Sequence, residues 1–407
     1  MVLGEGRSKM TRQRLAHNVL ERAAAFLEDN ADLFDDVPEF LGRQYDAGLA
    51  WAHFPEGIGG SGATLADHLA IVTMFADAGA PDARAANSLG WGVIAPAIAE
   101  FGTRELQERV LRRLFTGADQ FCQLFSEPGA GSDLAGLATR AVPVDGGWLI
   151  TGQKVWTSRG MTSTRGALLA RTDPAVPKHR GITFFILDLT QPGVEVRPLR
   201  QITGESMFAE IFMESAFVPD CDRVGDVGDG WNVATTALMN ERRYNSTRSA
   251  AGRSQLTIDQ DGFRQLIAAI ELRGGVSAIS DVASYRVAET WAQFEALRLW
   301  RWRSRNRSKS AKSADGAVGK VMWAEAGQLA SATAMELLGT EGLLWEDTTT
   351  EATLRDSTVV RGYLRSRGYS IEGGTSEIHR NVIGERILGL DKEASVEADL
   401  PWKDIPR

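Results

Sequence analysis

The chain has 407 residues, with 45 Lys or Arg and 53 Asp or Glu, so its net charge is −8 at pH 7 when histidines are neutral. At about 150 residues per domain, this length predicts two or three domains. The net acidity argues against a general nucleic-acid-binding protein, which needs a basic surface to contact phosphates. No segment approaches the roughly 20 apolar residues that span a bilayer, and the N-terminus lacks the apolar core of a signal peptide. We therefore expect a cytoplasmic protein without a membrane span.

The cysteines and histidines give no sign of a metal centre. Cys122 and Cys221 are too few for a disulfide framework or a four-cysteine metal site, and we predict two free thiols. The histidines lack the spacing of metal ligands; they are His17, His53, His68, His179 and His379. The chemistry of this protein is therefore expected to use carboxylates, hydroxyls or an organic cofactor.

Residues 1–120 are predicted to form an N-terminal helical domain. Apolar residues recur at helical spacing in 15–26 and again in 65–76, and the glycine-rich loop 54–62 separates these two stretches. Thr103 is predicted to cap a further helix that runs through residues 106–114.

Residues 121–226 are predicted to form a small, mostly antiparallel β domain. Short runs that are mostly apolar alternate with turn signals at 145–147 and 191–193. The expected strands are 148–151, 167–171, 182–189, 194–199 and 210–213.

Helical periodicity returns in residues 227–393, and 394–407 form a tail. We predict an interruption at 301–320, where a run of Arg, Lys and Ser favours a solvated connection over a phosphate-binding patch. The fold class is therefore α+β and multidomain, with a helical domain, a β domain and a second helical domain in chain order.

Two segments of the β domain contain candidate binding residues. The first, 125–133, reads Phe-Ser-Glu-Pro-Gly-Ala-Gly-Ser-Asp, and its small residues allow a polar cofactor or a phosphate to approach the backbone. Taken alone it is equally typical of an ordinary turn. The second, 148–160, is expected to place Trp156 and Ser158 at the end of a strand; taken alone, Trp156 is equally typical of a core aromatic.

Together with 181–189, 227–231 and 371–381, these segments resemble the acyl-CoA dehydrogenase family of flavoenzymes, over roughly residues 45–391. The resemblance implies an N-terminal helical domain, a β-barrel-like middle domain and a C-terminal four-helix bundle. It also implies that FAD lies between the middle and C-terminal domains and that the substrate is an acyl-CoA thioester.

The resemblance assigns candidate contacts residue by residue. Ser132 matches a position near both the cofactor and CoA, and Arg242 matches a position near the catalytic base that supports substrate binding. The residues that match cofactor-binding positions are Gln123, Phe125, Ser126, Gly131, Ser132, Trp156, Ser158, Thr375 and Glu377.

The catalytic base must be a carboxylate in an apolar, water-excluded site. Many family members place it where this chain has Gly373, whereas a second family pattern places it on the first long helix of the C-terminal domain, where this chain has Glu241. Glu241 follows Ala234 and Ala237 at helical spacing, so we expect it on the apolar face. Glu372 as the base, or a chain without a functional base, remain alternatives. By resemblance, the backbone N–H of Gly373 donates to the thioester carbonyl.

The resemblance also predicts partners. Electrons are expected to pass to an electron-transfer flavoprotein, and the chain is expected to form a homo-oligomer, either a dimer or a tetramer. Many members carry an Arg-Lys-x-Phe-Gly stretch that reaches the FAD of a neighbouring subunit, and residues 252–287 contain nothing of that form. Two alternatives for assembly therefore stay open: a hetero-oligomer and a non-catalytic subunit of one. Two alternatives for the chemistry also stay open: a flavin-dependent oxidase and a member acting on a non-thioester substrate. The length, branching or sterol character of the acyl group is not predicted.

Overall fold

The computed structural model describes residues 19–247, 263, 266, 267, 270, 271, 274–306, 315–340, 357–392, 397 and 399–406. The chain divides into two compact units. The first unit comprises Met1–Leu199, Ser206–Tyr244 and Val396–Arg407, and the second comprises Arg200–Glu205 and Asn245–Ser395. No helix in the described ranges is both long and apolar enough to cross a membrane.

The first unit begins with helices whose ends follow local capping signals. The Thr103 hydroxyl accepts from the backbone N–H of Leu106 at 3.2 Å, which confirms the predicted cap. Thr64 and Asp67 form a reciprocal capping box at the start of another helix. The helices are residues 19–29, α2 (Val37–Asp46), α3 (Leu65–Asp77), α4 (Ala83–Leu89), α5 (Ala95–Phe101) and α6 (Arg104–Thr116), with a π turn at Gly90–Ile94.

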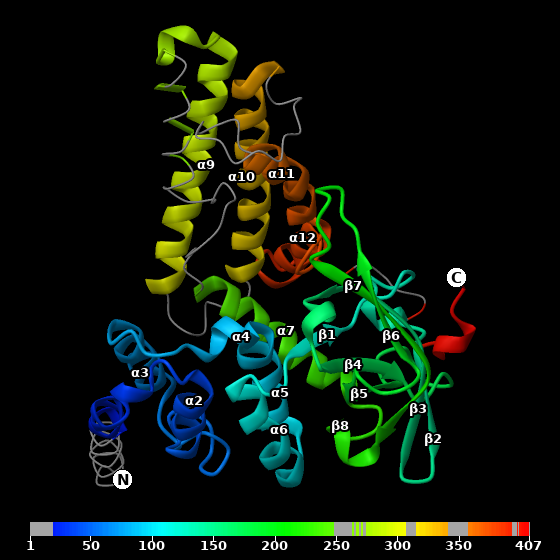
Figure 1. Ribbon diagram of the computed structural model, residues 1–407. Helices are drawn as coiled ribbons and strands as arrows, with labels where there is room; N and C mark the ends of the chain where they lie inside the picture. Colours follow the sequence, from blue (N-terminus) through cyan, green and yellow to red (C-terminus); the bar gives the residue numbers. More distant parts are fainter. Residues whose placement is uncertain are drawn as a thin grey trace, which may run out of the picture. The chain divides into compact units, whose positions relative to one another are not determined.

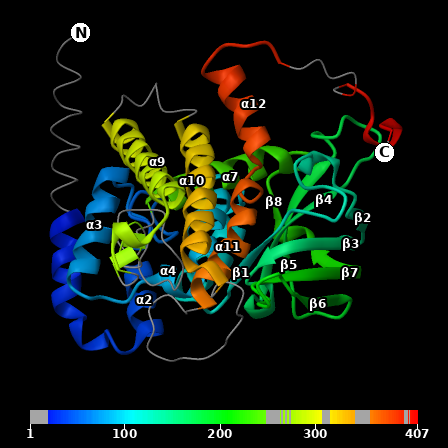
Figure 2. The ribbon, with the colours of Figure 1, turned by 90° about the horizontal axis from the view of Figure 1, so that it is seen from above.

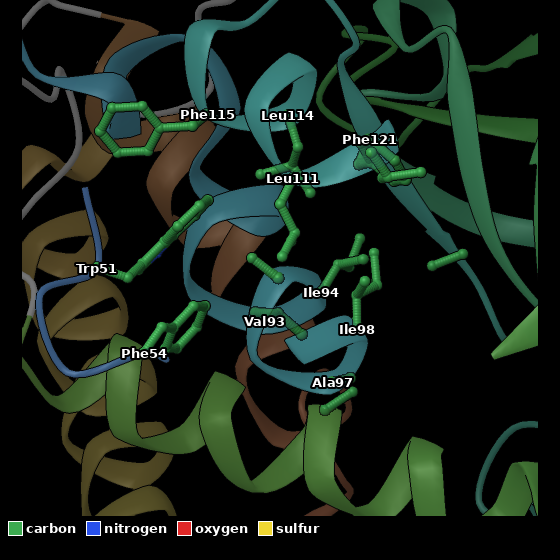
Figure 3. Packing of buried hydrophobic residues seen from close by; sticks show 14 of the residues in the cluster. Trp51, Phe54, Val93, Ile94, Ala97, Ile98, Leu111, Leu114, Phe115 and Phe121 are labelled. Carbon is green, nitrogen blue, oxygen red and sulfur yellow. The ribbon is translucent and has the colours of Figure 1, made fainter. Parts of the chain in front are cut away.

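An aromatic and aliphatic core holds these helices together (Figure 3). Trp51 stacks on Phe54 with ring centroids 5.2 Å apart and planes 16° from parallel. Phe115 meets Trp51 edge-on at 5.0 Å. Burying a side chain of this size stabilises the fold by roughly 1.5–3 kcal/mol. The same core includes Phe121, the first residue of the sheet, so it joins the helices to the β domain.

A buried amide fixes the place where the sheet begins. The Asn87 side chain donates to the carbonyl oxygens of Leu114 (3.2 Å) and Asp119 (3.0 Å). Its Oδ1 accepts from the backbone N–H groups of Gly90 and Phe121, both at 3.2 Å. One side chain therefore pairs four backbone groups that burial would otherwise leave unpaired.

The strands form one sheet in the order β6-β7-β3-β2-β4-β5-β8, and β1 pairs with β4 (Figure 1). The pairs β1–β4 and β2–β4 are parallel and the others are antiparallel, so the sheet is mostly antiparallel, as predicted. β3 and β7 run beyond their predicted ends because register shifts between them let the pairing continue. Alternation of apolar and polar residues in the sequence does not reveal such shifts. The strands are β1 (Phe121–Leu124), β2 (Arg140–Val144), β3 (Gly147–Ser158), β4 (Arg165–Arg171), β5 (Ile182–Asp188), β6 (Val194–Leu199), β7 (Phe208–Pro219) and β8 (Arg223–Val224).

Helix α7 (Gly230–Thr247) follows the sheet, and most of it belongs to the first unit. In the second unit α10 contacts α9, α11 and α12, and α9 and α10 lie side by side in both views (Figures 1 and 2). The described helices of this unit include α9 (Asp281–Asn306), α10 (Asp315–Leu338), α11 (Ser357–Ser366) and α12 (Ser376–Arg386).

The interruption predicted at 301–320 is too long. α9 continues to Asn306 and α10 begins at Asp315, and 307–314 lie outside the described residues. Arg301 and Arg303 are exposed, and arginine has a high helix propensity, so a basic run at a solvent-facing helix end does not break the helix. The indole N–H of Trp300 donates to the carbonyl oxygen of Asp315 at 3.2 Å, which joins the two helices.

The last described residues pack against the middle part of the first unit. The backbone N–H of Trp402 donates to Val176 (2.9 Å) and that of Lys403 to Pro174 (3.0 Å). The Trp402 ring lies 4.3 Å from the guanidinium carbon of Arg171. The segment predicted only as a tail is therefore held by backbone pairing and a cation–π contact.

Candidate functional site

The first candidate segment continues from the end of β1. Phe125 is buried and meets Phe184 edge-on at 6.0 Å, so its ring belongs to the core. Gln123 and Ser126 are half-buried. The backbone N–H of Val155, on β3, donates to the carbonyl oxygen of Ser126 at 3.0 Å. The structure thus brings the end of β1 beside the last part of β3.

Beneath this segment lies a buried ion pair. Lys154 is fully buried, and its Nζ donates to Glu127 Oε1 (2.8 Å) and to the Phe125 carbonyl oxygen (3.0 Å). The carboxylate of Glu127 also accepts from the backbone N–H groups of Ala138 (2.6 Å) and Thr139 (2.9 Å). Burial lowers the pKa of Lys154 to about 8. Burial raises the pKa of Glu127, but Lys154 and the other donors outweigh burial and lower it, so the carboxylate stays ionised.

The end of β3 carries the second candidate segment. The register with β7 shifts between Lys154 and Thr157, and Trp156 within this bulge has φ +59°. Trp156 is 57% exposed and its ring meets Phe208 edge-on at 5.8 Å, so the interpretation of Trp156 as a core aromatic is wrong. Ser158 is the last residue of β3, as expected. A left-handed backbone at a bulky residue costs on the order of 1–2 kcal/mol and is a feature to relate to function.

The loop between β1 and β2 carries Gly131 and Ser132, both exposed. The guanidinium of the buried Arg171 donates to the carbonyl oxygens of Ala135 (2.6 Å) and Leu137 (3.0 Å). The exposed part of the loop is therefore supported from the sheet by backbone hydrogen bonds.

The second unit contains a separate group of candidate residues around a glycine turn. Gly373 and Gly374 have φ +64° and +92°, and they precede Thr375, whose hydroxyl caps α12 by accepting from Ile378 N–H at 3.2 Å. The buried ring of His379 places Nε2 3.0 Å from the Gly373 carbonyl oxygen. The turn thus exposes backbone groups directly before a helix N-terminus, where the dipole favours anions.

The charged residues around this turn differ in their environment. The Glu372 carboxylate forms an ion pair with Arg365. Lys320 donates to the carbonyl oxygen of Tyr369, and burial lowers the pKa of its ammonium group. The Glu377 side chain is exposed in the first turn of α12. Glu372, the alternative base, is thus engaged by a cation rather than held in an apolar environment.

The preferred base, Glu241, lies in α7. Ala234 and Ala237, seven and four residues before it, are buried, whereas Met239 is exposed, so the predicted apolar face of this helix is present up to Ala237. The side chains of Glu241 and Arg242 lie outside the part of the chain that the structure describes.

The residues fit the cofactor that the resemblance implies. The exposed indole of Trp156 offers a face to a planar ring, and the glycine turn before α12 offers N–H groups to phosphates. Among the described residues no group of three His, Cys, Asp or Glu side chains could hold a metal ion, and Cys122 and Cys221 are free thiols. Sequence reasoning missed Lys154, Glu127 and Arg171. Lys154 and Arg171 are charged residues within strands, and this is a signal of buried, paired charges.

Models of the acyl-CoA dehydrogenase N-terminal, middle and C-terminal domains match residues 8–118, 122–216 and 228–388. Acyl-CoA dehydrogenase FadE34 of Mycobacterium tuberculosis is 40% identical over 352 residues, which are 85% of this chain. The match spans only 45% of that relative. Acyl-CoA dehydrogenase IpdE1 of the same organism is 35% identical over 364 residues, 89% of this chain and 90% of the relative.

Solved structures agree with these matches. The Tcur3481–Tcur3483 steroid ACAD has a TM-score of 0.69 at 23% identity, over 94% of this chain and 98% of that chain. An acyl-CoA dehydrogenase from Geobacillus kaustophilus has a TM-score of 0.66 at 23% identity, over 91% of this chain and 98% of that chain. The ChsE4–ChsE5 complex from Mycobacterium tuberculosis has a TM-score of 0.63 at 27% identity, over 94% and 98%. Because family models match along most of its length, the chain belongs to the acyl-CoA dehydrogenase family of oxidoreductases.

Proposed function

We propose that the protein catalyses the FAD-dependent α,β-dehydrogenation of an acyl-CoA thioester to the trans-2-enoyl-CoA. The observation that carries the proposal is the β3 bulge, which exposes Trp156 beside Ser158 in a chain of this family. When bound, FAD supplies the acceptor for the hydride that leaves the β-carbon.

The proposed cofactor-binding residues form two groups, one in each unit. In the first unit, Trp156 would shield the flavin ring and Ser158 would donate a hydrogen bond to it. Gln123, Phe125 and Ser126 would also contact the ring. The half-burial of Gln123 and Ser126 supports these roles, since both remain accessible from one side. In the first unit, Gly131 and Ser132 would also contact the cofactor and CoA. In the second unit, Thr375 and Glu377 at the start of α12 would contact the cofactor.

The proposed chemistry divides between a base and a hydrogen-bond donor. Glu241 removes the α-proton, and the apolar face of α7 that includes Ala234 and Ala237 supplies the water-poor surroundings that a base needs. The Gly373 N–H donates to the thioester carbonyl and stabilises the enolate-like charge, an effect usually worth roughly 3 kcal/mol per donor. Arg242 supports substrate binding beside the base.

We further propose that an electron-transfer flavoprotein accepts the electrons and that the chain works as an oligomer. Large apolar side chains on α9, among them Tyr285, Leu299 and Trp302, are exposed, and such patches are typical of contact surfaces. A homo-oligomer, dimer or tetramer, is the first proposal. A hetero-oligomer is the second, because the ChsE4–ChsE5 complex shares this fold. The region that would carry the Arg-Lys-x-Phe-Gly stretch is 252–287, and the structure describes only part of it.

The test is the visible spectrum of the purified protein, recorded anaerobically while acyl-CoAs of increasing length and branching are added. A steroid-side-chain thioester belongs in the series, since a steroid ACAD shares the fold. Bleaching of the flavin band by one class would support the proposal and name the substrate.

Other outcomes would overturn it in distinguishable ways. A yellow protein that no thioester bleaches would favour a non-thioester substrate. Reoxidation by O2 as fast as by an electron-transfer flavoprotein would favour an oxidase. A colourless protein that takes up flavin only when co-expressed with a partner would favour a subunit of a hetero-oligomer.

A further inference from the structure

We propose that Lys154 is a positioning residue, which fixes the end of β1 against the end of β3 so that the cofactor-contacting groups of both strands face the same ligand. The inference rests on the proposed function, because that function assigns Ser126 and Trp156 to the cofactor. It adds a residue that contacts neither cofactor nor substrate and acts through the backbone.

The geometry of the Lys154 ammonium group is the first argument. Its Nζ bonds the carbonyl oxygen of Phe125 at 3.0 Å and the carboxylate of Glu127 at 2.8 Å. The next residue, Val155, bonds the carbonyl oxygen of Ser126 at 3.0 Å. Two consecutive residues of β3 therefore hold three consecutive residues that extend β1.

Glu127 carries the connection to the far end of the loop. Its carboxylate accepts from the backbone N–H groups of Ala138 and Thr139, directly before β2. Its own backbone pairs with Ala130 in both directions, at 3.0 and 3.1 Å. The carboxylate therefore closes the loop that carries Gly131 and Ser132, and Lys154 fixes the carboxylate.

Lys154 also marks where the bulge of β3 begins. It is the last residue in regular register with β7, opposite Ile211, before pairing resumes at Thr157. Trp156 keeps its left-handed backbone between these two positions. Such a conformation persists only when its surroundings over-determine it, and a buried anchor two residues earlier supplies part of that constraint.

The choice of a charged pair at a fully buried position is the last argument. Replacing a buried ion pair by apolar residues of similar volume is often neutral or stabilising, so the pair is poorly explained by stability. Its directional bonds, in contrast, specify which backbone carbonyl lies beside which strand, and that is what a preorganised site requires.

The test compares a double variant with a matched control. In Lys154→Met with Glu127→Gln, both charges are removed together, so no unpaired buried charge remains. The control, Arg197→Met with Glu195→Gln, removes an exposed ion pair on β6 of the same sheet. The measurements are the FAD dissociation constant from flavin fluorescence, the visible circular dichroism of the bound flavin, its midpoint potential and the melting temperature.

We expect the double variant to fold, to bind FAD at least ten-fold more weakly and to show an altered flavin dichroism band, while the control matches the wild type in all four measurements. A folded double variant with wild-type affinity, dichroism and potential would overturn the proposal. If the double variant fails to fold, Lys154→Gln with Glu127→Gln, which also leaves no buried charge, decides. Weaker FAD binding would then support the role, and unchanged binding and dichroism would overturn it. A wild-type chain that binds no flavin overturns the proposed function together with this inference.

Discussion

The two groups of proposed cofactor residues are built by different physical means. In the first unit, Ser126 and Trp156 lie on strand ends that the buried Lys154–Glu127 pair holds in place. In the second unit, Gly373 lies in a turn held by two left-handed glycines, the Thr375 cap and the ring of His379. The first group therefore depends on contacts between residues distant in the chain. The second depends on the backbone conformation of seven consecutive residues, 373–379.

This difference determines which substitutions each group tolerates. The sheet group should withstand changes of exposed residues but not the loss of one partner of a buried pair, which leaves a charge uncompensated. The turn in the second unit should withstand charge changes but not the addition of a Cβ where the backbone is left-handed. The predictions below compare the two units, from the largest expected effect to the smallest.

The largest effect is expected from the two candidate bases, one in each unit. Glu241→Gln should retain FAD but lower the rate of flavin reduction by roughly 10²–10⁴-fold, the range for loss of a general base. Glu372→Gln should lower it far less, because Arg365 already engages that carboxylate. Anaerobic stopped-flow absorbance with the preferred acyl-CoA measures both rates. A larger loss in Glu372→Gln would move the base to the second unit.

Acid should reveal a buried titratable group elsewhere in the first unit. Burial, together with the nearby charges of His53 and Arg84, lowers the pKa of His68 from 6.5 to about 3. Between these values the unfolded chain binds a proton that the folded chain does not, so stability falls as pH falls from 6.5 toward 3. At roughly 1.4 kcal/mol per pKa unit, the loss should reach a few kcal/mol near pH 4.

The control for this prediction is His68→Phe, which keeps a ring beside Trp91 and does not titrate. Nδ1 of His68 has no hydrogen-bond partner within the described part of the chain, so the variant loses no hydrogen bond at that atom. Melting temperatures from pH 7 to pH 4 should fall less steeply for His68→Phe than for the wild type. Equal slopes would show that another group controls the acid response.

A smaller effect is expected from the glycine turn of the second unit. In Gly373→Ala the nearest atom to the new Cβ is Lys320 Cε at 3.8 Å, so the cost is the left-handed backbone alone, roughly 1 kcal/mol. In Gly374→Ala the Cβ would lie 3.0 Å from His379 Nε2 and would displace the ring, which raises the loss to about 2 kcal/mol. Urea unfolding measures both, and equal losses would remove His379 from this account.

The contrast also explains what the sequence could predict. The Thr103 cap, the positions of β4, β5 and β6 and the strand end at Ser158 follow from patterns within a few residues, and the structure has them. The strands β1, β2 and β8 were not predicted. The pairing of Lys154 with Glu127 spans 27 residues, and no periodicity encodes which distant charge a buried lysine meets. The bulge at Trp156 is likewise set by pairing with another strand, so alternation along β3 alone could not reveal it.

The smallest effect is expected where the C-terminal segment docks. The Trp402 ring lies over Arg171, and its indole N–H donates to the Gly136 carbonyl oxygen at 3.2 Å. Trp402→Ala should cost about 1 kcal/mol, and Trp402→Phe less, because it keeps the ring contact and loses only the hydrogen bond. Urea unfolding and limited proteolysis of the C-terminus measure these losses.

FAD affinity should not change in either Trp402 variant, because the buried Lys154–Glu127 pair, rather than the docked segment, is proposed to close the loop that carries Ser132. A loss of FAD affinity in Trp402→Ala as large as in the Lys154 double variant would contradict this. The loop would then depend on a contact made from outside the sheet, through Arg171 and its bonds to the loop backbone. In that case the C-terminal segment, rather than the buried Lys154–Glu127 pair, would position the loop that carries Ser132. The two units would then differ because one depends on a docked segment, not because it contains a buried ion pair.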